Sequence, residues 1–464
     1  MSAIRFDYTN VLAEAVGEEH GLTRSEFEGL APASLRALEA VLARRKADLC
    51  WLDLPHQEAS VREITDFANR VQGRFKNVCV LGIGGSALGN IALHTALSSP
   101  YHNLVPPPGI PRLFVLDNVD PDLVGEFLDQ IDPAETLFNV ISKSGGTAET
   151  MAQFLIFRRH LIDALGEKNH REHMVVTTDV EKGVMREIVR RDGYRSFVVP
   201  DGVGGRFSVL SPVGLVSSAL VGIDVQGLLA GAAEMDERCR AASFHSNPAL
   251  VHAAVQFLLH TKKKKPMAVC FSYSHRLKDL ADWYAQLLAE SIGKKLSRRG
   301  DVVHRGPTPI RAVGVTDQHS QVQLYAEGPF DKWFTLLAVD EPDHAVAIPH
   351  AHADLEGVAY LGGRTLKELF QAEREGTRIA LTEARRPNGT LAMEKVDAHS
   401  LGQLIFLLEL SVAVMGEHYD VDAFDQPGVE AGKVAAYALM GRKGYEKRRS
   451  EIEKASAARS PRTV

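Results

Sequence analysis

The chain has 464 residues, 45% of them hydrophobic and 24% charged, which is enough for two or three domains with sizeable cores. This composition excludes a mainly disordered, collagen-like or low-complexity protein. A formal net charge of -6 argues against general binding to nucleic acids or to anionic membranes. The four cysteines lie far apart and form no CxxC pair, as is typical of free thiols in a reducing cytoplasm.

The beginning of the chain is predicted to form a helical extension over residues 1–50. Within it, residues 34–47 repeat apolar side chains at spacings of three and four, as one face of a helix does. The first residues lack the apolar segment of a secretory signal. We therefore expect a cytoplasmic protein that does not associate with membranes.

Five short apolar runs between residues 78 and 200 alternate with helix-like segments. This alternation predicts a parallel sheet covered by helices on both faces. The runs are 78–81, 113–116, 137–141, 174–178 and 196–200.

The same order of elements recurs in the second half of the chain. Strands are expected at 266–273, 310–315 and 333–339, and helices at 278–292, 401–416 and 429–440. The apolar stretch 401–415 contains Gln403 and Glu409 and is too short to cross a bilayer, so we expect a buried helix. The sequence thus predicts an α/β protein with one domain over 51–240, a second over 241–440 and a basic, solvated tail over 441–464.

Two glycine- and serine-rich turns in the first domain suit phosphate groups. In VLGIGGSALGN, Gly82, Gly84 and Gly85 follow a strand, and Ser86 opens a helix whose free N–H groups attract an anion. The same glycines fit a relaxed dinucleotide fingerprint.

The second turn is NVISKSGGTAETM, where three hydroxyls and one lysine follow a strand: Ser142, Lys143, Ser144 and Thr147. This set suits a phosphate monoester, although a helix cap with ordinary turn residues has the same pattern. Because both turns follow strands of one parallel sheet, they can share a crevice at its carboxyl edge.

Later segments supply candidate catalytic groups. Arg206 follows glycines in DGVGGRFSVLSP, which lets the backbone pack closely while the guanidinium reaches a ligand. Glu290 continues the apolar stripe of the helix KDLADWYAQLLAESIGK, with Gln286 one turn earlier. In the last turn the helix dipole disfavours negative charge, which suits a carboxyl that both takes and gives a proton. A solvated glutamate at a frayed end is the alternative.

Two further residues stand near element boundaries. His319 follows a strand in GVTDQHSQVQL, and Lys433 lies on a mainly apolar stripe in FDQPGVEAGKVAAYALM. That helix is expected to begin with Asp425 or Gln426 as its N-cap and Pro427 in its first position. For each residue taken alone, a structural role is the better interpretation.

Together these segments closely resemble the phosphoglucose isomerase family. The matching stretches GIGGSALG, SKSGGTAET, VGGRFSVLSPVGL, QLLAESIGK, TDQHS and FDQPGVEAGK occur in the family's order and span residues 82–433. The resemblance implies two sugar-isomerase (SIS) α/β/α domains with mainly parallel sheets and flavodoxin-like layering, with helical extensions at both ends. It also implies a homodimer with sites at the subunit boundary, the interconversion of glucose 6-phosphate and fructose 6-phosphate, and no metal or cofactor.

The resemblance also implies a role for each motif. Glu290 would move a proton between the first and second carbons through a cis-enediol, and Arg206 would stabilise its negative charge. His319 from the neighbouring subunit and Lys433 would help to open the sugar ring. The residues expected to hold the phosphate or line the pocket are Gly85, Ser86, Ser142, Lys143, Ser144, Thr147, Gly205, Gln286 and Gln426. The chain departs from the pattern at Gly146, where a threonine is common, and so lacks one possible phosphate donor.

Three rival interpretations stay open. The relaxed glycine fingerprint with Asp117 after the next strand suits a nicotinamide dehydrogenase. The spacing HxHxxxE, formed by His350, His352 and Glu356, echoes a cupin metal motif. A non-catalytic sugar-phosphate sensor would need the phosphate turns alone. Whether mannose 6-phosphate is also accepted depends on pocket geometry that the sequence leaves open.

Overall fold

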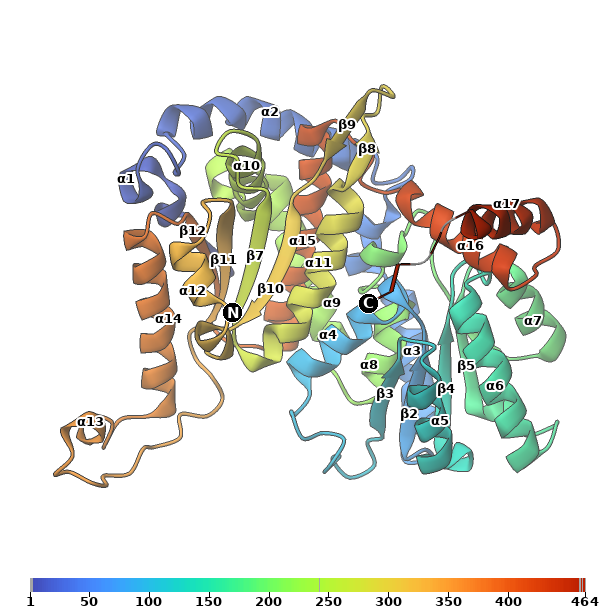
Figure 1. Cartoon of the computed structure of the whole chain (residues 1–464). Coiled ribbons are helices and arrows are strands. Elements are labelled where there is room, and N and C mark those ends of the chain that lie inside the picture. The colour runs from blue at the N-terminus through green and yellow to red at the C-terminus, as the bar shows by residue number, and fades with distance from the viewer. Residues whose placement is uncertain (1–2, 242, 459, 461, 464) are drawn as a thin grey trace.

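Two five-stranded sheets, each covered by helices, organise the molecule (Figure 1). The computed structural model describes residues 3–241, 243–458, 460 and 462–463. All strands of the first sheet are parallel, and four of the five in the second sheet are parallel as well. The predicted α/β class with mainly parallel sheets is therefore confirmed.

The first sheet is built from the five apolar runs predicted between residues 78 and 200. Its strands are β2 (Asn77–Leu81), β3 (Arg112–Leu116), β4 (Thr136–Ile141), β5 (Met174–Thr178) and β6 (Arg195–Val198). Its helices are α3 (Glu58–Val71), α4 (Leu88–Leu97), α5 (Pro121–Gln130), α6 (Ala148–Leu165), α7 (Val184–Asp192) and α8 (Pro212–Leu220). Val78 and Val80 pack in the core with α3, α4 and α8, whereas Cys79 and Leu81 pack with α5, α6 and α7. Alternate residues of β2 are thus buried on opposite faces, as expected for a strand covered on both sides.

The second sheet uses the later half of the chain. Its parallel strands are β7 (Met267–Tyr273), β10 (Thr308–Val313), β11 (Lys332–Val339) and β12 (Asn388–Met393). Its helices are α10 (Pro248–Thr261), α11 (Lys278–Ile292), α12 (Val322–Glu327), α13 (Glu356–Ala359), α14 (Leu366–Glu383) and α15 (Ala398–Tyr419). The helix predicted over 278–292 is confirmed at both ends by α11. β12 was missed because its sequence, NGTLAM, begins with two residues that rarely occur in strands.

The first 50 residues are not purely helical, so the predicted helical extension is wrong in part. They contain helices α1 (Ala13–Val16) and α2 (Arg24–Ala43), but β1 (Arg5–Asp7) adds an antiparallel edge strand to β12. Three residues without an apolar run carry no periodic signal, so only pairing with β12 reveals this strand. A further hairpin, β8 (Lys294–Leu296) with β9 (Val302–Arg305), follows α11 and was also not predicted.

Helix α15 confirms the expectation of a buried apolar helix. It is long and apolar enough to cross a membrane by composition, yet 89% of its most apolar 18-residue window is buried. It packs against α2, α10, α11 and α9 (Val225–Ala241) between the two sheets. The helix is therefore explained as a core element that joins the two halves.

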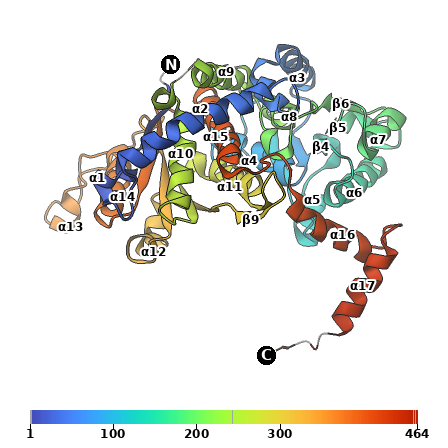
Figure 2. The ribbon, with the colours of Figure 1, turned by 90° about the horizontal axis from the view of Figure 1, so that it is seen from above.

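The C-terminal helices leave the body of the molecule. Viewed from above, α16 (Glu430–Leu439) and α17 (Glu446–Ala457) extend away from both sheets (Figure 2). Ala438 is the only described α16 residue that is buried. One hydrogen bond, from the Tyr437 hydroxyl to the Gly146 carbonyl oxygen at 3.1 Å, ties this arm to the first sheet.

The two sheets share one strand order. The first runs β3-β2-β4-β5-β6, and the second runs β10-β7-β11-β12 before β1 closes its edge. Among the parallel strands of each sheet, the one that comes first in sequence lies between the second and the third. Connections leave such a sheet in opposite directions at this switch point, which opens a crevice at the carboxyl ends of the two strands. In the first sheet, both predicted phosphate turns follow the switch-point strands, β2 and β4.

Candidate active site

The turn after β2 lies directly against the loop that carries Arg206. Residues Gly84–Ser86 form the 3-10 turn η3, and Gly205–Phe207 form η6. A Cβ atom added at Gly85 would lie less than 2.5 Å from the carbonyl group of Gly205 and 2.8 Å from Arg206 N. Only glycine permits this approach of two backbones, so Gly85 joins the first predicted phosphate turn to Arg206.

The turn after β4 is ordered by its own hydroxyls. The Ser142 Oγ accepts a hydrogen bond from Gly145 N at 3.1 Å, and the Ser144 Oγ accepts one from Gly146 N at 3.3 Å. Thr147 occupies the N-cap position of α6 without a side-chain capping bond. Its hydroxyl is therefore not used to cap the helix, contrary to the capping interpretation of this turn.

The ammonium of Lys143 contacts backbone carbonyl groups, which the neighbouring serines in its turn did not predict. Its ammonium donates to the carbonyl oxygen of Val203 at 3.0 Å and to that of Pro200 at 3.4 Å. The charge thus braces the segment that leads into Arg206 and also lies beside the turn after β4. Sequence spacing alone could not predict these carbonyl partners, since they are about 60 residues away.

Arg206 is the most constrained side chain of the site. It is buried, and its guanidinium donates five hydrogen bonds to groups from α11 and from the segment after α15. The acceptors are Ser291 Oγ at 2.8 Å, Glu290 Oε2 at 3.2 Å, Gln426 Oε1 at 3.1 Å, Ala423 O at 2.6 Å and Asp425 O at 2.9 Å. Because these partners fix the plane of the guanidinium, the cation is preorganised beside Glu290.

Glu290 lies in the last turn of α11, as predicted, and it is not a solvated glutamate at a frayed end. Its Oε2 contacts Arg206 Nη1, and its Oε1 accepts a hydrogen bond from Gln286 Nε2 at 2.9 Å. The Oε1 atom of Gln286 is buried without a hydrogen-bond partner among the described residues. A buried acceptor of this kind is costly unless a donor reaches it, which favours a ligand hydroxyl at this point.

Electrostatics at the site are set by burial. Burial lowers the pKa of the Arg206 guanidinium from its ordinary value, and the Glu290 and Asp425 carboxylates oppose that change. Removal from water strengthens the attraction between this cation and any oxyanion that forms nearby.

Two site residues were missed by the sequence analysis. Ser291 is fully buried and orients Arg206 through its Oγ. Lys294 is also buried, and its ammonium donates to the carbonyl oxygens of Glu290 and Asp425, each at 2.6 Å. The available signal for Lys294 was its position just after the helix end at Gly293, where cations favour the last carbonyl groups.

Gln426 joins the site, and the predicted helix start is confirmed in part: Gln426 holds the N-cap position and Pro427 the first position, but of a short 3-10 turn. Residues Pro427–Val429 form a separate 3-10 turn, and α16 begins only at Glu430. The side chain of Gln426 makes no capping hydrogen bond and instead accepts one from Arg206. Because the charged donor of Arg206 takes the side-chain oxygen of Gln426, this residue occupies the N-cap position without a side-chain capping bond.

His319 and Lys433 are not brought to Glu290 within the described chain. His319 is exposed at the end of the 3-10 turn Thr316–His319 after β10, and none of its hydrogen bonds or ion pairs links it to the described site residues. Lys433 lies on α16 and pairs with Glu430 at 2.8 Å. Contacts within a single chain therefore connect neither residue to the pair Arg206–Glu290.

The rival metal site is not supported. Among the residues that the structure describes, no group of three or more His, Cys, Asp or Glu side chains could hold a metal ion. The imidazole of His350 instead packs where Cβ atoms at Gly362 and Gly363 would lie, at 2.7 and 2.8 Å. The described structure therefore does not bring His350, His352 and Glu356 together as metal ligands.

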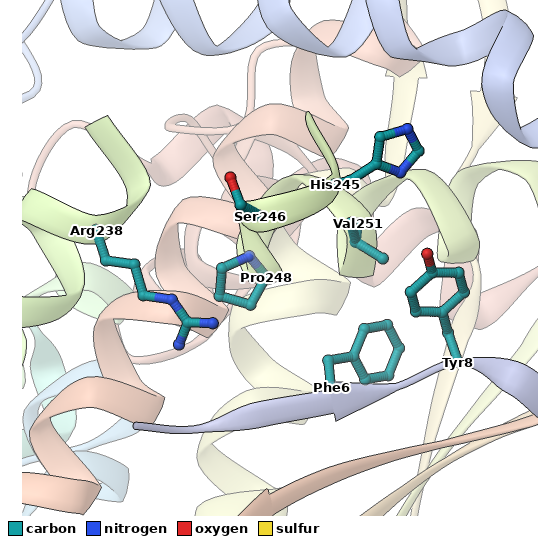
Figure 3. Close-up of a pocket in the computed structure, with 7 residues that line it drawn as sticks. All are labelled: Phe6, Tyr8, Arg238, His245, Ser246, Pro248 and Val251. Carbon is teal, nitrogen blue, oxygen red and sulfur yellow. The ribbon is translucent and has the colours of Figure 1, made fainter. Parts of the chain in front are cut away.

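Further cavities lie outside this site. One of about 460 Å³ lies between β1, α9 and α10 (Figure 3). Two polar side chains that line this cavity already bind other residues of the protein. Arg238 donates to the Ile4 carbonyl oxygen, and His245 pairs with Glu28. Another of about 630 Å³ lies at the carboxyl ends of β7, β10 and β11, at the switch point of the second sheet. The chain there reads SYSH and has no glycine-rich turn like that of the first sheet.

Comparisons with known proteins agree with this arrangement. The sequence family described as phosphoglucose isomerase matches residues 63–458. A glucose-6-phosphate isomerase from Carboxydothermus hydrogenoformans is 46% identical over 97% of this chain and 98% of its own length. One from Rubrobacter xylanophilus is 45% identical over 96% of this chain and all of its own length. The crystal structure of a hypothetical protein from Thermus thermophilus has a TM-score of 0.85 at 37% identity, covering 94% of this chain and 100% of that chain.

A more distant structure shares the fold. A glucose-6-phosphate isomerase from Chlamydia trachomatis has a TM-score of 0.80 at 22% identity, covering 93% of this chain and 89% of that one. The relatives from Carboxydothermus hydrogenoformans and Rubrobacter xylanophilus are named isomerases and align over 98% and 100% of their own length. This overturns the dehydrogenase interpretation of the glycine fingerprint.

Proposed function

The chain belongs to the phosphoglucose isomerase family, and we propose how its residues divide the work of that reaction. The activity is the reversible aldose–ketose isomerisation of glucose 6-phosphate and fructose 6-phosphate. In the open-chain sugar, one proton moves between C2 and C1, and the hydroxyl proton moves between the two oxygens. We place this reaction in the cytoplasm, where the four free cysteines stay reduced.

Glu290 is the proposed carrier of the carbon-bound proton. Its carboxylate takes the proton from C2, the C1–C2 double bond forms, and the electron pair of the aldehyde moves to O1. The same carboxyl returns the proton to C1, and C2 becomes the ketone carbon. A carboxyl fixed by Arg206 and Gln286 is suited to serve both carbons, because it need not be displaced between the two steps.

Arg206 is the proposed stabiliser of the enediolate. The contact that carries this proposal is the 3.2 Å pair between Arg206 Nη1 and Glu290 Oε2, because it places a buried cation next to the base. The Nη1 atom of Arg206 donates to both Glu290 and Gln426. An oxyanion that replaces either acceptor can therefore bind a donor that is already oriented.

The phosphate is proposed to lie between the two turns at the switch point of the first sheet. Ser86, Ser142, Ser144 and Thr147 supply hydroxyls, and Lys143 supplies positive charge beside them. Gly85 and Gly205 let these turns approach Arg206, so the phosphate end and the reacting carbons of one substrate can be held together.

Ring opening is assigned to His319 and Lys433. The exposed His319, which the described contacts of its own chain do not connect to Glu290, supports a homodimer in which each subunit lends this histidine to the other. Mixing Glu290→Gln and His319→Ala subunits tests this. Random dimers restore one complete site per mixed dimer, so about a quarter of the wild-type sites return. No recovery after subunit exchange would contradict the shared site.

The catalytic proposal is tested with purified protein, fructose 6-phosphate and EDTA, with glucose 6-phosphate measured by a coupled dehydrogenase. We expect turnover in EDTA, and we expect Glu290→Gln to lower kcat about 10²- to 10⁴-fold while inorganic phosphate still inhibits in the binding range of the wild type. Activity restored only by a divalent metal would contradict a metal-independent site. Near-normal turnover by Glu290→Gln would refute its role as the base.

A further inference from the structure

Lys294 connects the end of α11 to the segment that follows α15. It stands at the first position of β8, and its ammonium donates to the carbonyl oxygen of Glu290 on one side. On the other side it donates to the carbonyl oxygen of Asp425 and lies 3.1 Å from the Asp425 carboxylate. One buried cation therefore joins two segments that are 131 residues apart in sequence.

The same two segments hold Arg206. The carbonyl oxygen of Asp425 accepts from both Arg206 and Lys294, and Glu290 contacts Arg206 through its carboxylate and Lys294 through its backbone. Displacement of the segment at Asp425 would release two of the five acceptors that orient the guanidinium, Asp425 O and the neighbouring Gln426 Oε1. The two cations thus form one hydrogen-bond network around the proposed base.

We propose that Lys294 is a positioning residue of the isomerase reaction, which keeps Glu290 and Arg206 in register by clamping the end of α11 to the Asp425 segment. This inference rests on the proposed roles of Glu290 and Arg206. Lys294 acts through these residues, because its donors face backbone oxygens and a carboxylate of the protein. Burying the charged ammonium of Lys294 is unfavourable, and these hydrogen bonds offset that cost. Burial still lowers the pKa of the ammonium.

Replacement of the ammonium tests the clamp. Lys294→Met keeps most of the stem and removes the donors, and Lys294→Gln keeps an N–H donor and guards against failure to fold. We expect kcat for fructose 6-phosphate to fall about 10- to 100-fold in Lys294→Met, since lost hydrogen bonds to charged groups have effects of this size. Inhibition by inorganic phosphate should stay within about twofold, because the described hydrogen bonds of the Lys294 ammonium reach Glu290 and Asp425 and none reaches the phosphate turns. Lys294→Gln should lie between Lys294→Met and the wild type.

Lys295 offers a matched control on the same strand. Its side chain is exposed and makes no hydrogen bond or ion pair among the residues that the structure describes. Lys295→Met should therefore leave kcat, KM and thermal midpoint near those of the wild type. Circular dichroism and thermal midpoints are measured for every variant, so that activity is compared per folded molecule.

Two outcomes would overturn the proposal. A lowered thermal midpoint in Lys294→Met with kcat within twofold of the wild type would show a purely structural role. Parallel losses of kcat and of phosphate binding would show general damage to the site. Both are distinguishable from failure of the proposed function, which would appear as an active Glu290→Gln variant.

Discussion

The contact between the two glycine turns predicts a severe effect for Gly85→Ala. The added Cβ would lie less than 2.5 Å from the Gly205 carbonyl group, whereas ordinary contacts begin near 3.4 Å. The loop that carries Arg206 must therefore move by about 1 Å, because both contacting groups are backbone. A misplacement of this size in a catalytic group lowers turnover about 100-fold. The assay is steady-state kinetics with fructose 6-phosphate, together with thermal midpoints.

Gly204→Ala is the matched control for this prediction. Gly204 lies in the loop that carries Arg206, directly before Gly205, and its φ is -74°. A Cβ atom at Gly204 would meet no atom within 4 Å. This variant should keep kcat within about twofold of the wild type, because neither the backbone conformation nor the space opposes a methyl group. If Gly85→Ala also kept near-normal kcat and stability, the argument that the two turns must touch would be refuted.

Two further predictions concern buried ionisable side chains. Arg206→Lys should lower kcat about 10²- to 10³-fold in steady-state assays, because an ammonium cannot supply the five fixed donors of the guanidinium; a loss below tenfold would contradict its proposed role. Glu409 is fully buried in α15, and burial raises its pKa well above the ordinary value, so the folded state keeps a proton that the unfolded chain loses above about pH 4.3. The contribution of this carboxyl to stability is therefore fully present below that pH and falls by about 1.4 kcal/mol per pH unit above it until the folded carboxyl ionises. Denaturant unfolding of Glu409→Gln from pH 5 to 8 should remove this slope; equal slopes in both proteins would contradict it.

Much of the fold was predictable because its signals are local. The buried strands of the first sheet are short apolar runs, and α11 shows a helical stripe that ends before Gly293. These patterns depend on alternation and on end residues within a single segment. Elements without such signals were missed: β1 has only three residues, and β12 begins with Asn-Gly.

The members of the candidate site were predictable in part, and their contacts were not. The motifs identified Arg206, Glu290, Gln286 and Gln426, and the structure brings these four together. Side-chain partners far away in sequence decided the rest. The side chain of Gln426 binds Arg206 instead of making a capping hydrogen bond, and the ammonium of Lys143 faces carbonyl oxygens near Val203.

The sequence by itself therefore determined the α/β class, the positions of most strands and the residue types that the chemistry requires. Glycine and hydroxyl turns after apolar runs carry this information because they act over a few residues. Only the tertiary structure decided that Gly85 must be glycine, that Ser291 and Lys294 belong to the site, and that His319 stands outside it within one chain. These features depend on which backbones touch across the fold, and such distances are set by the packing of whole sheets and helices rather than by any one segment.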